Sequence, residues 1–342
     1  MDPLSQGVLG AAAAQALFNR KLKPRTWLIG AVGGVLPDAD IFIRSAADPL
    51  LAVEVHRQFT HSLVFIPIGG LIAALPWLLR RTNNGERWGI YGAATVGYAT
   101  HGLLDACTTY GTQLYWPFST FRAAWHVVSI LDPIFTFVLL AGVVLSALSA
   151  RRLPAIIALV LALGYLSLGY MQRERALDAQ ESLASARGHV RTRGEVFPTI
   201  GNQLVWRSLY EESGTLHADR IRVPWFSSAL YKSGTSVPAV EERDLPEEQR
   251  RDARIIRDFH RFRWFSGGWV ARAPEDSTVI GDVRYSLRTD SFDPIWGVRF
   301  HPGASPPTEW VNRTRDRKLG VRALWDEIAG RGELQPIPKV DN

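Results

Sequence analysis

Long apolar stretches in the first half of the chain constrain its fold more than any other feature. Four of them approach the roughly 20 residues that a helix needs to cross a bilayer; they cover residues 62–79, 88–106, 127–148 and 154–171. Because lipid offers the backbone no hydrogen-bond partners, we expect each to be a helix. Two shorter apolar pieces, residues 8–18 and 27–36, are too short to span unaided. The first half therefore predicts an α-helical membrane domain with about four long spans plus two short N-terminal helices.

Charged residues are distributed unevenly along the chain. Residues 1–171 hold only 12 of the 39 Lys and Arg residues and 8 of the 33 Asp and Glu residues. The remainder is charge-rich, with both signs interleaved. An apolar half followed by a polar half indicates two domains in different solvents. We therefore expect the second half to lie outside the membrane.

The second half has the composition of a mostly β domain. Residues 172–187 place Glu, Arg, Ala and Leu at helical spacing and predict a stalk helix. Short segments rich in Val, Ile and aromatic residues follow, separated by turn residues; they cover residues 202–210, 217–226, 264–271, 279–287 and 296–300. Residues 246–262 and 310–328 predict helices. The predicted domains are a helical membrane domain at 1–171, a stalk helix or linker at 172–195 and a β-rich domain at 196–342.

Basic residues between the spans indicate the orientation, because short cytoplasmic loops are enriched in Lys and Arg. Such residues lie in the loops between spans and before the second short helix: Arg20, Lys21, Lys23, Arg25, Arg80, Arg81, Arg87, Arg151 and Arg152. These loops are expected in the cytoplasm, which places residues 107–126 and the chain after residue 171 outside. Arg173 and Arg175 favour the opposite orientation weakly. No basic region precedes the first apolar run, so a cleaved signal peptide is not expected.

Several classes of function lack their sequence signals. The single cysteine, Cys107, excludes an internal disulfide framework and a Cys-based zinc site. The net charge of +6 comes from basic residues interleaved with acidic ones, so nucleic-acid binding is not expected. No serine-hydrolase elbow, His-Glu-x-x-His pair or phosphate-binding P-loop is present. The sequence also indicates no particular protein partner for the C-terminal domain.

Ionisable residues cluster at the predicted outer ends of the first helices, where they are costly unless they form a site. Asp38 and Asp40 follow the second short helix at Pro37, and their carboxylates could share a cation; a plain polar loop is the alternative. His56 and His61 precede the first long span. On one regular helix their imidazoles would diverge by about 140°, so a turn is needed for both to reach one ion. A positively charged interface is the alternative there.

His101 and Asp105 form the sharpest signal. Their spacing of four residues puts an imidazole and a carboxylate on one helix face, which suits metal capture or a carboxylate that orients a histidine. A packed His–Asp pair without metal is the structural alternative. Asp132, near the outer end of the third span, needs a partner such as His126, Arg122, the cluster or a substrate cation. We place Asp132 and His126 beside the ligands rather than among them.

The order of these motifs resembles the YdjM-type family of inner-membrane proteins assigned as metal-dependent hydrolases. The matching pieces are Asp2-Pro3-Leu4, Leu36-Pro37-Asp38-Ala39-Asp40, His56-Arg57, Thr60-His61-Ser62, His101 with Leu104-Asp105, and Trp116-Pro117-Phe118. The resemblance covers about the first half of the chain. It implies a bacterial inner-membrane protein with Asp38, Asp40, His56, His61, His101 and Asp105 as metal ligands. Gln6 stands where family members often have a histidine, and we group it with Thr60 as a residue around the ligands or substrate.

The expected function is a membrane-bound metal-dependent hydrolase. One or two divalent ions, Zn²⁺ or Mn²⁺, would lower the pKa of a bound water, which then attacks an ester or phosphoester. Asp40 or Asp105 would act as general base, and Arg57 would stabilise the developing negative charge. The depth of the site at the outer headgroup level favours a lipid or lipid-linked phosphate as substrate.

Two other functions use the same residues. A metal or proton transporter would need polar groups that continue across the bilayer, whereas these gather at one end. A non-catalytic membrane anchor could present the β-rich domain to a partner and use the cluster as a structural metal site. A structural site would be coordinatively closed, and its loss would unfold the protein.

Overall fold

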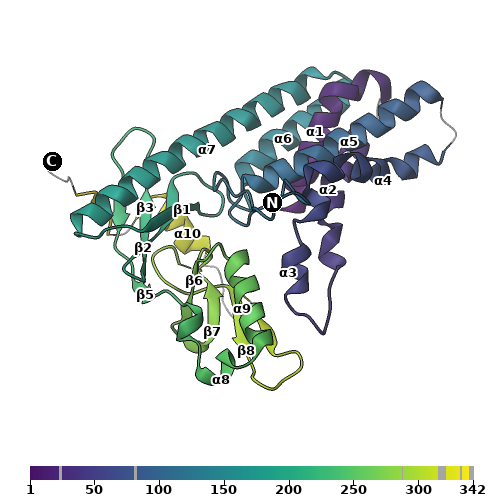
Figure 1. Cartoon of the computed structure of the whole chain (residues 1–342). Coiled ribbons are helices and arrows are strands. Elements are labelled where there is room, and N and C mark those ends of the chain that lie inside the picture. The colour runs from purple at the N-terminus through teal and green to yellow at the C-terminus, as the bar shows by residue number, and fades with distance from the viewer. Residues whose placement is uncertain (23–24, 81–82, 287, 315–320, 332, 339–342) are drawn as a thin grey trace. The chain divides into compact units, whose positions relative to one another are not determined.

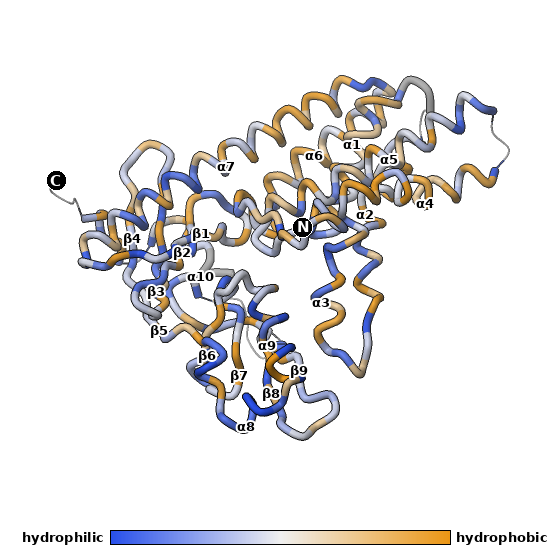
Figure 2. Tube along the Cα trace, viewed as in Figure 1, coloured by the Kyte–Doolittle hydropathy of each residue, from blue (hydrophilic) through white to orange (hydrophobic). Residues whose placement is uncertain are grey.

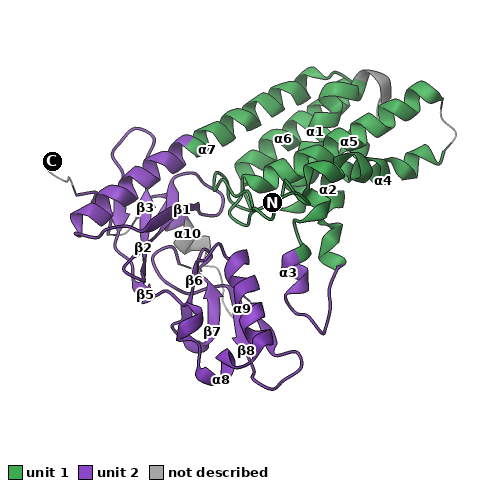
Figure 3. Cartoon of the chain, viewed as in Figure 1, with its two compact units in different colours: residues 1–42, 55–170 green, residues 43–54, 171–342 purple. Residues whose placement is uncertain are grey.

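The computed structural model describes residues 1–342 except 23–24, 81–82, 287, 315–320, 332 and 339–342 (Figure 1). The chain divides into two compact units: residues 1–42 with 55–170, and residues 43–54 with 171–342 (Figure 3). A helical N-terminal region is followed by a mostly antiparallel β region, as the sequence predicts. Lys23 and Arg81, used above for the orientation, lie outside the described residues, as do Leu287 and residues 315–320 of two predicted elements.

The first unit is a bundle of helices. They are α1 (Pro3–Leu22), α2 (Thr26–Val35), the 3-10 helices η1 (Leu36–Phe42), η2 (Phe59–His61) and η3 (Leu63–Phe65), then α4 (Ile66–Leu78), α5 (Asn84–Ala106), α6 (Pro133–Ser149) and the first part of α7 (Leu153–Ala186). Most of the length of these helices is apolar, whereas apolar and polar residues are mixed along the C-terminal elements (Figure 2). The two short apolar pieces of the sequence thus lie in α1 and α2.

Glycines bring α1, α2 and α5 into close contact. A Cβ added at Gly30 would collide with the carbonyl oxygen of Gly10, and one at Gly97 would collide with the carbonyl oxygen of Gly30. A Cβ at Gly34 would collide with the carbonyl oxygen of Gln6. Small residues let membrane helices approach backbone to backbone. This packing holds the start of α1 and the ends of α2 and α5 together, and those are the parts that carry the candidate site.

Fewer helices meet the length and hydropathy of a membrane span than the sequence pattern suggested. Within the described residues, α7 is long and apolar enough to cross a membrane, and Leu51–His61 with Leu63–Leu78 would be a second span if that pair, bent by 57°, is counted as one. The shorter helix α6 is also apolar. The structure therefore supports one or two apolar spans, and the arrangement of about four long spans stays a prediction.

The third predicted span begins later than the sequence suggested. Residues 127–132 of the third predicted span are not helical, because Asp132 caps α6 and Pro133 occupies its first turn. The Asp132 carboxylate accepts the backbone N–H groups of Ile134 and Phe135, at 3.1 Å each, and so satisfies the helix start. Residues 172–186 of the predicted stalk are helical, and they form the C-terminal part of α7, which runs unbroken for 34 residues.

The second unit contains two antiparallel sheets. One has the strand order β1 (Arg193–Pro198), β2 (Val205–Glu212), β3 (Thr215–Arg222), β4 (Leu230–Lys232) and β10 (Gln335–Pro336), with β5 (Ser236–Pro238) also paired to β3. The other has the order β6 (Val270–Ala273), β7 (Asp276–Asp282), β8 (Trp296–Phe300) and β9 (Thr308–Asn312). The helices that lie between and after these strands are η4 (Glu242–Asp244), α8 (Glu247–Arg250), α9 (Ala253–Phe265) and α10 (Val321–Ile328). The C-terminal part of the predicted helix at 310–328 is therefore present, but its start is a strand.

Residues 43–54 interrupt the first unit in the sequence and belong to the second. They lead into the short helix α3 (Leu51–Val55). Arg261 of α9 donates to both carboxylate oxygens of Asp48, at 2.9 Å each, and to Glu54. Leu50 is 2 % exposed and shares a small pocket with Phe262. The segment between the two halves of the predicted ligand set is thus held by a helix more than 200 residues away in the sequence.

Candidate metal centre

Local breaks in the helices bring the predicted ligands together. Pro37 ends the regular α2 helix, and the 3-10 helix η1 that follows carries Asp38 and Asp40. Between His56 and His61 the chain turns at Arg57, whose φ is +64°. A non-glycine residue held in this conformation costs about 1–3 kcal/mol. Here it allows the turn that the spacing of the two histidines demanded.

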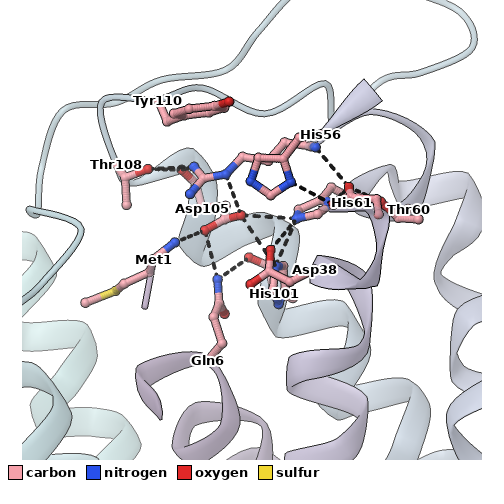
Figure 4. A network of polar contacts seen from close by, with 12 residues as sticks. Met1, Gln6, Asp38, His56, Thr60, His61, His101, Asp105, Thr108 and Tyr110 are labelled. Atoms are coloured by element: carbon pink, nitrogen blue, oxygen red, sulfur yellow. Dashed lines mark hydrogen bonds and ion pairs between the residues drawn. The ribbon is translucent and has the colours of Figure 1, made fainter. Parts of the chain in front are cut away.

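Four ligand atoms converge at the centre of the cluster (Figure 4). The Nε2 atoms of His61 and His101 are 2.9 Å apart. Asp38 Oδ1 lies 3.5 Å from the first and 3.3 Å from the second, and Asp105 Oδ2 lies 3.2 Å and 3.4 Å from them. A tetrahedral site with bonds of about 2.0–2.2 Å has ligand atoms roughly 3.3–3.6 Å apart. The four distances between the carboxylate oxygens and the imidazole nitrogens, 3.2–3.5 Å, lie in or next to this range, and the distance between the two Nε2 atoms is shorter.

Outer hydrogen bonds fix which nitrogen of each histidine faces the centre. His101 Nδ1 lies 2.6 Å from the carbonyl oxygen of Gly34, so this nitrogen carries the proton and donates. His61 Nδ1 lies 3.3 Å from Asp40 Oδ2, which likewise favours a proton there. If both rings are neutral, as in histidines that bind metal, both Nε2 atoms have lone pairs that point at each other. Two facing lone pairs need a proton or a cation between them. Hydrogen bonds like those of the two Nδ1 atoms are typical of histidines that bind metal through Nε2.

Asp105 supplies the second sign that the cluster fits a cation. Its Oδ1 accepts a hydrogen bond of 2.9 Å from Gln6 Nε2 and contacts the amino group of Met1. Its Oδ2 is buried and accepts no hydrogen bond among the described residues. That atom is 3.0 Å from Arg57 Nε as an ion pair. A buried carboxylate oxygen without a hydrogen-bond donor is costly, and a metal ion would remove that cost.

Asp40 and His56 form a second group around Asp38. Asp40 Oδ1 lies 2.7 Å from His56 Nδ1, and Oδ2 accepts hydrogen bonds from Thr60 Oγ1 at 2.7 Å and from the backbone N–H of Arg57 at 3.0 Å. Asp38, Asp40 and His56 each offer a ligand atom within 4.8 Å of the others. Because Asp38 belongs to both groups, one ion or two could be held. In this structure Asp40 also orients His61.

The two aspartates of η1 are held in their charged forms. Burial alone would raise the pKa of Asp38, but hydrogen bonds and charge from His101 and His61 hold that pKa well below its usual range. The pKa of Asp40 is lowered in the same way by His56 and His61, against the effect of burial. Both carboxylates are therefore available to a cation near neutral pH.

Arg57 lies over the cluster and under an aromatic ring. Its guanidinium donates to Thr108 Oγ1 at 2.9 Å and lies 4.6 Å from the ring centre of Tyr110. Thr108 and Tyr110 come from the connection at residues 107–126, which the sequence places on the outer side. Arg57 is 4 % exposed, so its charge acts in a largely dry environment, where electrostatic effects are strong.

The other predicted residues lie around the cluster or apart from it. Gln6 contacts Asp105, and Thr60 bonds Asp40. Asp132 caps α6 and accepts a hydrogen bond of 2.8 Å from Tyr165, so its charge has partners outside the cluster. His126 has a φ of +53°. The roles of Asp132 and His126 toward a substrate stay predictions. Sequence reasoning missed the amino group of Met1, which no motif signals.

The first half of the chain matches a known family. Residues 1–176 match the family model described as YdjM inner membrane protein. The chain belongs to the YdjM inner membrane protein family. It is also 32% identical over 124 residues to inner membrane protein YbcI of Escherichia coli (strain K12), a match that covers 33% of this chain and 67% of YbcI. No solved structure matches. The resemblance drawn from the motifs is confirmed, and the chain is a YdjM family membrane protein with a buried His/Asp cluster that could bind metal.

Proposed function

We propose that this protein is a membrane-bound metal-dependent hydrolase that cleaves an ester or phosphoester at the outer face of the bacterial inner membrane. The observation that supports this most directly is the convergence of one ligand atom each from His61, His101, Asp38 and Asp105, all within 4.8 Å of one another. The outer bonds of both histidines leave their Nε2 atoms free for a cation. Imidazole and carboxylate donors in this arrangement suit Zn²⁺, with Mn²⁺ as the second choice.

Three of these residues would hold the ion, and the fourth would move the proton. Asp38, His61 and His101 form the proposed ligand set, and Asp40 and His56 would complete a second position if two ions bind. A divalent ion held there supplies Lewis acidity, which makes water a usable nucleophile near neutral pH. Asp105 Oδ2 faces the same centre and accepts no hydrogen bond from the residues that the structure describes, so it is placed to accept a proton from the attacking water.

Arg57 supplies the positive charge that a hydrolase of this kind needs. Its guanidinium is held by Thr108 and the face of Tyr110, so it is already oriented before a substrate arrives. A fixed, poorly solvated cation stabilises negative charge that develops in the transition state. The exposed edge of the cluster is formed by Asp38 and His56, whose side chains are 18 % and 19 % exposed. Substrate would enter from that edge.

The substrate class follows from position in the membrane. The cluster lies where α2 ends and α5 ends, and the predicted orientation puts both ends at the outer face. A site at this depth meets lipid headgroups before it meets solutes. We therefore propose a lipid or lipid-linked phosphoester as substrate, with the β-rich domain on the same, extracytoplasmic side.

The first experiment measures metal by plasma mass spectrometry in the purified full-length protein and three variants, His61→Ala, His101→Ala and Asp105→Ala. His217→Ala is the matched control, because His217 lies in β3 of the second unit. We expect near-stoichiometric Zn or Mn in the wild type and the control and its loss in folded His61→Ala and His101→Ala. A wild-type protein that is stable and contains no metal would refute the proposed metal-dependent hydrolase.

One observation favours a structural metal site as the second candidate. If Asp105 also binds the ion, four protein atoms close the tetrahedron, as in structural zinc sites. Removal of metal with a chelator separates the two cases. A catalytic site leaves the helical content and thermal midpoint nearly unchanged and abolishes hydrolysis, whereas a structural site unfolds the first unit when the metal is lost.

A further inference from the structure

The loop between β3 and β4 exposes a pair of large aromatic residues. Phe226 is fully exposed, and Trp225 is 40 % exposed. Most large apolar side chains of the second unit are buried in its sheets, and Trp206 and Ile221, on the neighbouring strands, are completely covered. Adjacent exposed aromatics on a folded domain are a candidate surface for contact with another apolar phase.

Hydrogen bonds fix this loop to one turn of α7. Gln172 Nε2 donates to the carbonyl oxygen of Val223 at 2.7 Å and to that of Gln203 at 3.2 Å. Arg175 donates to the carbonyl oxygen of Ser227 at 3.0 Å. The loop is therefore held at both of its ends, beside residues 172–175 of α7.

The same turn of α7 is where its apolar surface ends. Leu163, Leu168, Tyr170 and Met171 are exposed large apolar or aromatic side chains, and no further one occurs in the described part of α7 after Met171. Residues 153–171 rise by about 28 Å at 1.5 Å per residue, close to the roughly 30 Å of a hydrocarbon core. Gln172, Arg173 and Arg175 follow directly. If α7 crosses the membrane, the bilayer surface lies at this turn.

We infer that the 223–229 loop is a membrane-contacting element that places Trp225 and Phe226 in the interface of the same bilayer that α7 enters. Aromatic side chains are enriched at this depth, where an apolar ring and a polar edge are both satisfied. Arg175 lies beside them and offers positive charge at the level of lipid phosphates. The loop would fix the tilt of the β-rich domain against the membrane surface. This inference is independent of the metal centre.

The experiment labels the loop with an environment-sensitive fluorophore. In a Cys107→Ser background, Phe226→Cys is labelled in the full-length protein in phosphatidylcholine nanodiscs. Part of the phosphatidylcholine carries a spin label near the carbonyl end of an acyl chain, which quenches only nearby fluorophores. Ser213→Cys is the matched control, because it lies in the exposed β2–β3 turn, at the other end of the same hairpin. The strands separate the two positions by roughly 25 Å at about 3.3 Å per residue.

We expect the label at position 226 to emit at shorter wavelength than the label at 213 and to be quenched several-fold more strongly. Equal, water-like emission at both positions would overturn the inference. Blue-shifted but unquenched emission at 226 would also overturn it, because a protein surface would then cover the loop. Strong quenching at both positions would show that the whole domain, rather than this loop, meets the lipid.

Discussion

Buried carboxylates in the two units are satisfied in different ways. In the β-rich unit, each oxygen of Asp282 accepts from Arg284, and Trp296 Nε1 lies 3.3 Å from Oδ2. Asp219 likewise accepts from Arg187 at both oxygens. In the helical unit, Asp105 is just as buried, yet within the described part of the chain its Oδ2 accepts no hydrogen bond and faces two imidazole nitrogens and a guanidinium.

The difference separates buried ion pairs that stabilise the fold from a cluster that could hold a cation. A buried charge with matched donors at every oxygen stabilises one conformation and leaves nothing for a ligand. Charges and lone pairs that converge without donors between them leave room for a cation. The N-terminal cluster is of the second kind, and the interior ion pairs of the C-terminal unit are of the first.

The largest expected effect is a loss of stability when the buried ion pair between Asp282 and Arg284 is broken. Asp282→Ala leaves the Arg284 guanidinium buried and without its carboxylate, since these side chains are 0 % and 5 % exposed in the intact pair. Removal of one partner of a buried pair costs about 3–5 kcal/mol of unfolding free energy. Thermal unfolding of the full-length protein should show this loss while metal content stays unchanged. The double variant Asp282→Ala/Arg284→Met should recover much of the stability, and a failure to do so would contradict the comparison.

Asp105→Asn should lower metal affinity, whereas Asp282→Ala lowers stability. The amide keeps the shape but removes the negative charge that faces the cation, so metal affinity should fall by about 100-fold, the upper end of the 10–100-fold that changes beside the ligands cost. Competition with a chelating dye measures this affinity. Asp219→Asn is the matched control, because Asp219 is as deeply buried but lies in β3. Equal affinities in the two variants would place Asp105 outside the metal site.

Thr60→Val tests the outer partners of the cluster. Thr60 Oγ1 donates to Asp40 and lies 2.9 Å from His61 Nδ1, so its loss frees the ring of His61 to tilt. We expect metal affinity to fall by about 10–100-fold without a change in fold. Thr100→Val removes a plain hydroxyl-to-backbone bond one residue before His101 and serves as control. The interpretation fails if the two variants weaken metal binding equally.

The smallest effect concerns pH and the C-terminal unit. Burial lowers the pKa of His217, and the charges of His189 and Arg187 lower it further. The unfolded state then binds more protons than the folded state below about pH 6.5, so stability is lost as pH falls through that range. The thermal midpoint should drop less between pH 7.5 and pH 5.5 in His217→Asn than in the wild type. A drop of the same size in both would assign the pH dependence to other groups.

Local spacing predicted the parts of the site that lie on one element. The interval of four residues placed His101 and Asp105 on one face of α5, and the interval between His56 and His61 required the turn that occurs at Arg57. The sequence could not separate Asp38 from Asp40, because both follow the same break at Pro37. Only the packed structure shows that Asp38 faces the four-atom cluster while Asp40 holds His61 and His56.

The fold was predictable where composition changes sharply, and less so where one sequence pattern is compatible with two local structures. The change from apolar to charged residues separated a helical from a β-rich region. The same change at residue 171 also divided the predicted span from the predicted stalk, but Gly169 does not interrupt the helix there and α7 continues. Asp132-Pro133 could lie inside a span or begin a helix, and the structure has the second. The assignment of residues 43–54 to the C-terminal unit rests on long-range contacts that no local pattern records.

The contact between Arg261 and residues 43–54 has a consequence for biosynthesis. Asp48 and Glu54 are made more than 200 residues before Arg261. At a synthesis rate of about 5–20 residues per second, the segment between Asp40 and His56 waits roughly 10–40 s for its partner. Throughout that interval the membrane helices can insert and pack, but the chain between these two residues lacks its final contacts. A protein shortened at residue 170 would keep this segment in its unfinished state permanently, so loss of metal from such a fragment would report missing contacts rather than missing ligands.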